Sequence, residues 1–327
     1  MARRLSAPSA GRNSITESGP KDLIRRNRKR PVKPLRVRIF GKNPLGWLFG
    51  APYLVFVIVI FAYPLMFAIY MSFFDYFFAA PGANVSRPFV GFDNYVTAFT
   101  DPAVLRSFAN VGIFLIINVP LTVILSLVLA SGLNSIKRFR TLLRVSYYVP
   151  YVTASVAIIG VWLFLFNQDG LVNHILGPLA PDPSWFVNPT LAMPMIAIYV
   201  TWKQLGFYIL LYLAALQNVP TELYEQASTD GAGRLQQFYY VTVPGVRTAT
   251  LLVLLLSTVI GANLFTEPYL LTGGGGPNGA STSPVLLIYQ QGLQQGHPGY
   301  AAAIGIGLVV FVMIIAFFQN RFAGDKD

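Results

Sequence analysis

Six long apolar runs divide this sequence and constrain its fold more than any other feature. Hydropathy places them at residues 47–74, 108–133, 144–167, 190–216, 246–271 and 299–320. A helix of about 20 apolar residues is long enough to cross the hydrocarbon core of a bilayer. A charged fraction of only 11% and a mean hydropathy of +0.55 also argue against a soluble core. The sequence therefore predicts an all-α integral membrane protein with six spans.

The distribution of basic residues predicts the orientation of these spans. Of the 24 Lys and Arg residues, 21 lie in segments that six alternating spans place on one side of the membrane. The other three are Arg87 and Arg106, in or beside the first outer loop, and Lys203, inside the fourth span. Basic residues collect on the cytoplasmic side of membrane proteins, so both termini are expected in the cytoplasm.

The first 44 residues form a basic head that carries 13 of the Lys and Arg residues. Its low apolar content predicts a disordered cytoplasmic segment at 1–44. Such a basic segment could bind nucleic acid. Attraction to anionic lipid and the positive-inside effect explain its positive charge without a further partner. The apolar run that follows is too long for a signal peptide, so it stays as a span. The membrane-spanning body is expected at 45–322, with a cytoplasmic tail at 323–327.

Residues that carry enzymatic or metal chemistry are scarce. The chain has no cysteine, and its two histidines lie far apart in loop-like sequence. The glycine run at 271–279 lacks the GK[ST] ending of a phosphate-binding loop and falls on the outer side. We therefore expect no catalytic residue, no bound cofactor and no metal site. Energy for any transport has to come from another polypeptide or from an ion gradient.

A polar island interrupts the apolar sequence between the fourth and fifth runs. The segment 219–244 reads VPTELYEQASTDGAGRLQQFYYVTVP. Pro220 is tolerated in a first helical turn, and Glu222 and Glu225 suit the positive end of a helix dipole. Gly231 can adopt the backbone angles that end a helix. The island is predicted to form a cytoplasmic helix, a glycine break and a second helical piece.

The spacing within this island resembles the EAA loop of binding-protein-dependent ABC importer permeases. The matching residues are Glu225, Ala227, Asp230, Gly231, Ala232, Phe238, Val241, Val243 and Pro244. Gln226 departs from the pattern, which has alanine there. An ordinary amphipathic cytoplasmic loop is the alternative interpretation.

The resemblance extends over about residues 47–320 and is to permeases of carbohydrate importers, similar to the larger maltose permease subunit. The strings that carry it are AYPL at 62–65, VGFDNY at 90–95, VPYVTAS at 149–155, FNQDGLVN at 166–173, TWKQLGF at 201–207, ALQNVP at 215–220 and LLTGGGGP at 270–277. The resemblance implies a type I importer fold in a bacterial or archaeal cell membrane, and a non-catalytic subunit.

The implied partners are a second homologous permease, two nucleotide-binding ATPase subunits, an extracytoplasmic solute-binding protein and membrane lipid. No nucleic acid partner is expected. ATP and Mg²⁺ would bind the ATPase subunits and not this chain. The island would then be a coupling helix that docks on an ATPase subunit. The residues expected to carry this coupling are Glu225, Ala227, Asp230, Gly231 and Ala232.

Candidate sugar contacts come from spans three to five. By resemblance, Tyr151 and Ser155 match an aromatic residue and a serine of the maltose permease site, Phe207 takes a tyrosine position and Ser257 matches another serine. Lys203 and Gln204 stand where that permease has leucine and glycine, and Gly261 and Leu264 stand where it has asparagines. The predicted pocket has therefore changed, and maltose is not implied. The complete set of candidates is Tyr151, Ser155, Lys203, Gln204, Phe207, Ser257, Asn263 and Glu267.

Each candidate also has a structural alternative. Lys203 is costly near the bilayer midplane, so it lines a cavity, or its stem snorkels, or it pairs with a carbonyl between helices. Ser155, Ser257 and Asn263 are of the type that joins transmembrane helices. Glu267 is a gate, a pocket acid or an interfacial residue. The aromatic residues Tyr147, Tyr148, Trp162 and Trp202 are interpreted as belt or packing residues, with a sugar-binding platform as the alternative.

Two other functional classes compete with an ATP-coupled permease. An ion-driven secondary transporter usually shows internal repeats and buried acidic residues, but the halves of this chain differ and its spans contain almost no acids. A membrane-bound enzyme or scaffold is the second alternative, and no nucleophile with a base converges here. We therefore expect a sugar-importing permease subunit, with the secondary transporter as the alternative.

Overall fold

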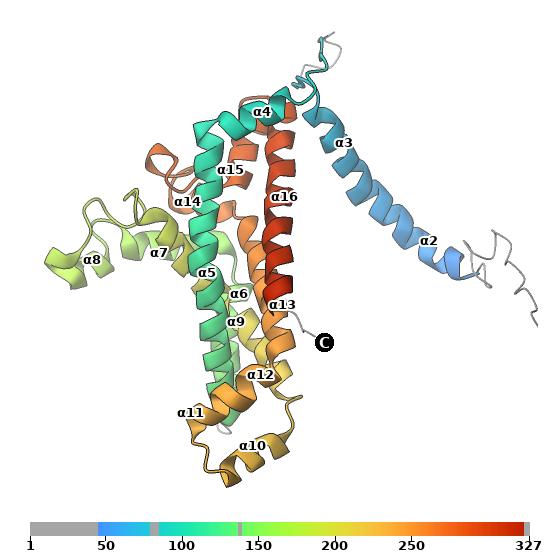
Figure 1. The fold of residues 1–327 in the computed structure, drawn as a ribbon. Coiled ribbons are helices and arrows are strands. Elements are labelled where there is room, and N and C mark those ends of the chain that lie inside the picture. The colour runs from blue at the N-terminus through green and yellow to red at the C-terminus, as the bar shows by residue number, and fades with distance from the viewer. Residues whose placement is uncertain (1–44, 79–84, 137–138, 324–327) are drawn as a thin grey trace, which may run out of the picture. The chain divides into compact units, whose positions relative to one another are not determined.

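The computed structural model describes residues 45–78, 85–136 and 139–323, and the regular secondary structure in these ranges is helical (Figure 1). Within them no strand forms, and Phe74 and Phe89 make an isolated antiparallel bridge. The predicted disorder at 1–44 lies outside the described residues. So does the predicted tail, except for Ala323, the last residue of the final helix.

The described chain divides into two units, with the boundary after Phe61. In the first unit, helix α2 spans Leu45–Val57 and leads into the π-helical turn η2 at Ile58–Ala62. None of the described side chains from Phe49 to Phe61 is buried within the chain. A helix that is apolar all round belongs in a lipid or protein environment, as expected for a first span.

The second unit begins at Ala62 and contains the remaining helices. Its first half comprises α3 Tyr63–Ser72, α4 Asp93–Thr100, α5 Pro102–Ser135, α6 Arg140–Val152, α7 Ser155–Phe166, α8 Leu171–Leu176, η3 Gly177–Leu179 and α9 Ala192–Leu216. Its second half comprises α10 Thr221–Thr229, α11 Arg234–Gln237, η4 Phe238–Thr242, α12 Val243–Gly245, α13 Arg247–Ala262, α14 Thr266–Leu271, η5 Pro277–Gly279, α15 Pro284–Tyr289, η6 Gln290–Gln294 and α16 Pro298–Ala323.

Five helical segments of the described chain are long and apolar enough to cross a membrane. They are Phe49–Ser72, Pro102–Ser135, Ser155–Leu179, Ala192–Leu216 and Pro298–Arg321. A sixth is the pair Arg234–Gly245 and Arg247–Ala262, which is bent by 70°. The predicted class of all-α membrane protein with six spans is confirmed if this bent pair counts as one span.

Side chains near the outer loops set where the helices begin. The carboxylate of Asp101 accepts a hydrogen bond from the backbone N–H of Ala103 at 2.8 Å, and Pro102 occupies the first position of α5. The hydroxyl of Ser283 caps α15 in the same way, by accepting from the N–H of Leu286 at 3.1 Å. These caps satisfy N–H groups that a helix start leaves without an intrahelical partner.

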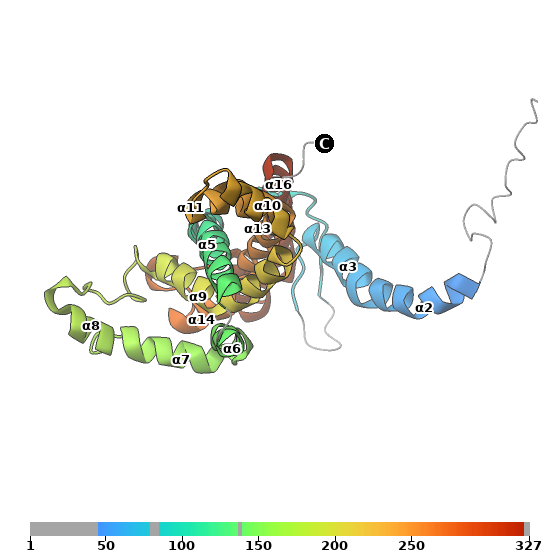
Figure 2. The same ribbon diagram turned by 90° about the horizontal axis from the view of Figure 1, so that it is seen from below.

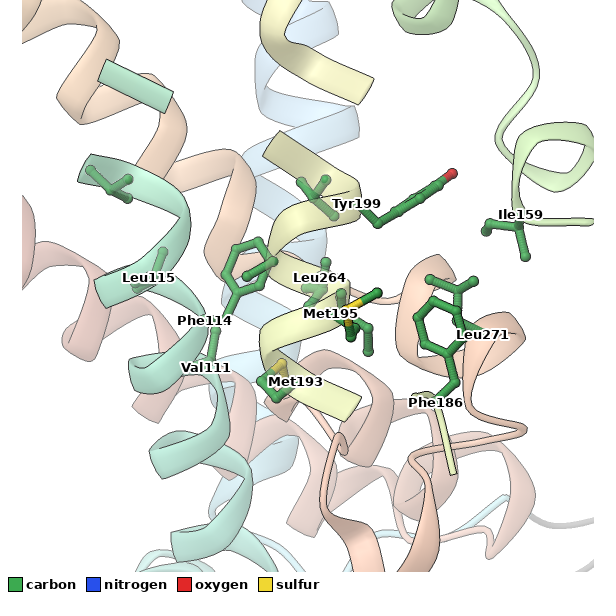
Figure 3. Packing of buried hydrophobic residues seen from close by; sticks show 14 of the residues in the cluster. Val111, Phe114, Leu115, Ile159, Phe186, Met193, Met195, Tyr199, Leu264 and Leu271 are labelled. Carbon is green, nitrogen blue, oxygen red and sulfur yellow. The ribbon is translucent and has the colours of Figure 1, made fainter. Parts of the chain in front are cut away.

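The core of the second unit lies where α5 packs along α9. One cluster joins Val111, Phe114 and Leu115 of α5 to Met193, Met195 and Tyr199 of α9, with Leu264 and Leu271 against them (Figure 3). Inside this contact the amide of Asn118 donates to the hydroxyl of Thr201 at 2.8 Å. A buried side-chain hydrogen bond of this kind fixes the register of two apolar helices that could otherwise slide.

A second cluster joins the other halves of α5 and α9 to α13. It contains Tyr208, Tyr212 and Leu216 of α9, and it includes Val219 and Val246 at the two ends of the polar island. The island is therefore fixed to the bundle by buried apolar residues at both ends.

The structure corrects three expected boundaries. The third span was expected to run through 144–167, but α6 ends at Val152 and the extended residues Thr153 and Ala154 separate it from α7. The fifth span was expected to reach residue 271, but α13 ends at Ala262 and a separate helix α14 follows. The outer segment 272–298, expected to be a loop, contains the helical turns α15 and η6. The first break falls at Thr153 and Ala154 and the second begins at Asn263, and each is too short to interrupt a hydropathy average over a window of residues.

Candidate functional site

Helix α10 of the polar island ends in a complete Schellman motif. Gly231 lies in the left-handed region with a φ of +82°. Its N–H donates to the carbonyl of Ser228 at 3.1 Å, and the N–H of Ala232 donates to the carbonyl of Ala227 at 2.9 Å. Glycine is the residue that takes this conformation without a steric penalty. Gly231 and Ala232 thus terminate the helix and turn the chain toward α11.

Side chains then fix the turn between α10 and α11. The amide of Gln237 donates to the hydroxyl of Ser228 at 2.9 Å and to the carbonyl of Ala232 at 3.0 Å. The N–H of Gly233 donates to the side chain of Gln236 at 2.8 Å, which caps α11. The island is an ordered helix–turn–helix unit and not a loose connection.

The outer surface of this unit combines charge with apolar area. Glu222, Glu225 and Asp230 are exposed, and among the described residues their carboxylates have no hydrogen-bond or ion-pair partner. Nearby, Leu235 is 70% exposed and Tyr240 is 79% exposed. Ordered helices with unpaired acids and uncovered apolar side chains have the surface chemistry of a protein-binding element.

The island is joined to the bundle at a close contact. Figures 1 and 2 show α10 and α11 at the end of the bundle where α9 finishes and α13 begins. The hydroxyls of Tyr224 and Thr242 are hydrogen-bonded at 3.0 Å. Val246, 1% exposed, lies at the bend between α12 and α13 in the same apolar cluster as Val219. A displacement of α10 would therefore be passed to α9 and α13 through packed residues.

Four of the predicted substrate residues meet where α9 faces the break between α6 and α7. The ammonium of Lys203 donates a hydrogen bond to the hydroxyl of Ser155. One helical turn further along α9, Phe207 stacks on Tyr151 with ring centroids 5.1 Å apart and ring planes 16° apart. Lys203, Ser155 and Phe207 are half-buried, whereas Tyr151 is 38% exposed. We call these four residues the α9 face.

Glycine at position 206 allows the two helices to approach this closely. A Cβ atom on Gly206 would collide with the backbone carbonyl of Tyr147 on α6. Because glycine lacks this atom, the α6 backbone lies directly against α9. This close approach sets the distance at which Tyr151 stacks on Phe207.

The other four candidates lie elsewhere. The hydroxyl of Ser257 is buried and donates to the carbonyl of Leu254. The amide of Asn263 donates to the carbonyl of Val259 at 2.7 Å, and Gln204 accepts from Tyr208 at 3.5 Å. Glu267, at the start of α14, is half-buried and interacts electrostatically with Lys203. Gln204 adjoins the α9 face through its chain neighbour Lys203 and through Tyr208, whose ring contacts Phe207.

The family of the chain is decided by comparison with known proteins. Residues 122–325 match the family described as the binding-protein-dependent transport system inner membrane component. The chain belongs to this family. It is therefore a multi-pass membrane permease, the transport component of such a system.

Two relatives and one solved structure illustrate what this permease is similar to. The arabinooligosaccharide transport permease AraP of Bacillus subtilis is 32% identical over 293 residues, which cover 88% of this permease and 90% of AraP. The trehalose/maltose transport permease MalF of Thermococcus litoralis is 33% identical over 280 residues, which cover 85% of this permease and 92% of MalF.

A bacterial alginate ABC transporter, crystallised in complex with a periplasmic protein that holds an alginate pentasaccharide, contains a chain of the same fold. Its TM-score is 0.72 at 22% identity, over 88% of the permease and 96% of that chain. The resemblance to permeases of carbohydrate importers is confirmed.

Tyr148, interpreted as a belt or packing residue, lies beside Tyr151 with ring centroids 5.5 Å apart and adjoins the aromatic surface of the α9 face. Sequence reasoning missed one feature of this permease, which is that the segment 278–279 is held against α5. Arg106 donates to the carbonyl of Asn278 at 2.5 Å, and Asn110 donates to that of Gly279 at 2.8 Å. The position of the charged Arg106 near the start of α5 was the available signal.

Proposed function

We propose that this permease moves a sugar, either an oligosaccharide or a related glycoside, into the cytoplasm, and that segment 219–244 couples it to separate ATPase subunits. The sugar class is supported by the names of its relatives, which transport arabinooligosaccharides in one case and trehalose or maltose in another. The aromatic pair Tyr151 and Phe207 agrees with it, because flat ring faces bind the apolar sides of sugars.

The observation that carries the coupling proposal is the ordered, capped and exposed α10. Its residues Glu225 and Asp230 offer charges that fix the orientation of a partner, while Val219 and Val246 tie the unit to α9 and α13. Closure of ATPase subunits bound there would move α10 as a rigid body. The attached spans would then switch between inward and outward access. Coupling of two binding sites requires that both act on this one equilibrium.

The partners in this proposal are a second permease, two ATPase subunits and a solute-binding protein, with ATP and Mg²⁺ bound by the ATPase subunits. A binding-protein partner is supported by the alginate transporter, which was crystallised with one. The basic 1–44 segment and the loop 134–144 place both termini in the cytoplasm in this scheme.

The test is uptake by the complete transporter reconstituted in proteoliposomes with its binding protein. We expect accumulation of radiolabelled saccharide that requires ATP on the ATPase side and persists when a protonophore and a sodium ionophore collapse the ion gradients. Uptake that stops with the gradients and ignores ATP would instead identify an ion-driven secondary transporter.

A further inference from the structure

Lys203 occupies an unusual position for a charged side chain in this permease. It lies at the middle of α9, whereas the other charged residues of the described spans lie in a turn, at the bend before α13 or close to a helix end. An ammonium group inside a membrane is costly unless water or an opposite charge compensates it. The position therefore requires a compensating group.

The described residues supply only a small part of that compensation. The Lys203 ammonium has three donor hydrogens, and it gives one of them to the neutral hydroxyl of Ser155. Glu267 acts on it electrostatically, but the two side chains do not form an ion pair within the described chain. Lys203 makes no hydrogen bond to a backbone carbonyl of the described residues. Two donors and most of the positive charge are left for another group.

The backbone next to Lys203 indicates that this region is not in contact with lipid. Thr153 and Ala154 interrupt the helix between α6 and α7, and both are exposed on the surface of this chain. Irregular backbone at membrane depth is tolerated where it lines a water-filled cavity or is covered by protein. A water-accessible path along the α9 face satisfies this condition and also hydrates the ammonium.

An aromatic surface lies one helical turn from the charge. Phe207 follows Lys203 by four residues, about 6 Å along a helix, and it stacks on Tyr151, with Tyr148 beside it. A sugar ring placed against these aromatic residues would carry a substituent to the ammonium. A hydroxyl there gains a hydrogen bond, but an acidic group also neutralises the charge, and charge-assisted bonds are roughly twice as strong as neutral ones.

We propose that the α9 face binds an acidic saccharide, with Lys203 pairing to its carboxylate, sulfonate or phosphate while Tyr151 and Phe207 hold the ring. This inference rests on the proposed function as a sugar permease and narrows its substrate class. Ser155 orients the ammonium through their hydrogen bond.

The experiment measures binding to the complete transporter in lipid nanodiscs, without its binding protein, so that the permease alone decides selectivity. The probes are matched pairs: digalacturonate with galabiose, and a 6-sulfonated and a 6-phosphorylated glucoside each with the plain glucoside. Binding is followed by thermal stabilisation and by tryptophan fluorescence, since Trp202 is adjacent to Lys203 and 42% exposed.

We expect at least one acidic probe to bind at least tenfold more tightly than its neutral partner. Lys203→Met should remove this preference by weakening the acidic probe at least tenfold while changing the neutral probe less than twofold, and Lys203→Arg should retain most of it. Arg321→Met is the matched control. It also removes one positive charge, but from an exposed position near the end of α16, and it should behave as the wild type.

The outcomes separate this inference from the proposed function. Equal binding of both members of every pair, or an equal loss of both in Lys203→Met, would mean that Lys203 is a structural residue, and the acidic substrate class would be wrong while sugar transport stood. Failure of the complete transporter to take up any saccharide with ATP would overturn both proposals.

Discussion

At the scale of single residues, two glycines act through opposite properties. Gly231 is required for its backbone conformation, because the left-handed turn after α10 has a φ of +82°. Gly206 is required for its lack of a side chain, because the α6 backbone occupies the space of a Cβ atom. A sequence shows both as the same letter, and only the structure separates the two reasons.

This distinction leads to a prediction for Gly231. Gly231→Ala forces a side chain into the left-handed region at a cost of roughly 1–2 kcal/mol, which should unravel the end of α10 and shift Glu225 and Asp230. We expect ATP-driven uptake to fall severalfold with normal membrane insertion, and Gly231→Asp or Glu225→Lys to abolish it. Gly233→Ala is the matched control, since Gly233 has an ordinary φ of −70° and a Cβ atom there would make only a normal contact of 3.8 Å with the side chain of Gln236. Equal effects of alanine at 231 and 233 would argue against a role for the turn geometry.

At the scale of elements, the island behaves as one unit because a few polar side chains bridge its pieces. Gln237 of α11 reaches back to Ser228 of α10 and to the carbonyl of Ala232. Helices as short as α10 and α11 are not stable alone, so these bridges and the apolar anchor at Val219 supply the order.

We therefore predict that Gln237→Ala loosens the island without unfolding the bundle. Loss of two hydrogen bonds should reduce the stability of this local unit by about 1–2 kcal/mol. Amide hydrogen exchange in segment 221–237 should become about tenfold faster, while exchange in α5 and α9 stays unchanged. Gln236→Glu keeps an acceptor for the N–H of Gly233 and serves as the control. Unchanged exchange in Gln237→Ala would show that packing alone orders the island.

At the scale of the whole molecule, much of the described apolar surface of the spans is uncovered. Helix α3 exposes Leu65 and Met66, and α16 exposes Met313 and Phe317, each by half or more. In a membrane protein lipid or a second chain covers such surface. This agrees with a permease that works within an assembly.

The orientation of the chain can be measured directly because it contains no cysteine. We predict that cysteine introduced at Gln226 reacts with a membrane-impermeant maleimide only after cells are opened. Cysteine at Val187, in the expected outer loop 168–189 and 57% exposed, should react in intact cells. Both sites are exposed, so differences in burial do not confound the result. The reverse pattern of labelling would invert the topology and remove the island from the cytoplasm.

The sequence by itself determined the class of protein, the apolar segments that can cross the membrane and the glycine turn of the island. Long apolar runs have few alternatives to crossing a bilayer, and a glycine at a fixed distance from a helical pattern marks a helix end by local sterics. The candidates Tyr151, Ser155, Lys203 and Phe207 were also named from sequence, but their meeting at one face was not derivable from the residues themselves.

Only the tertiary structure decided that meeting, because it depends on contacts between segments distant in sequence. Gly206 lets α6 lie against α9, and the break at Thr153 and Ala154 turns Ser155 toward Lys203. The same packing buried Ser257 and left Asn263 bonded to its own helix. Hydropathy averages over a window of residues, so it reports which segments enter the membrane and not which of their side chains face one another.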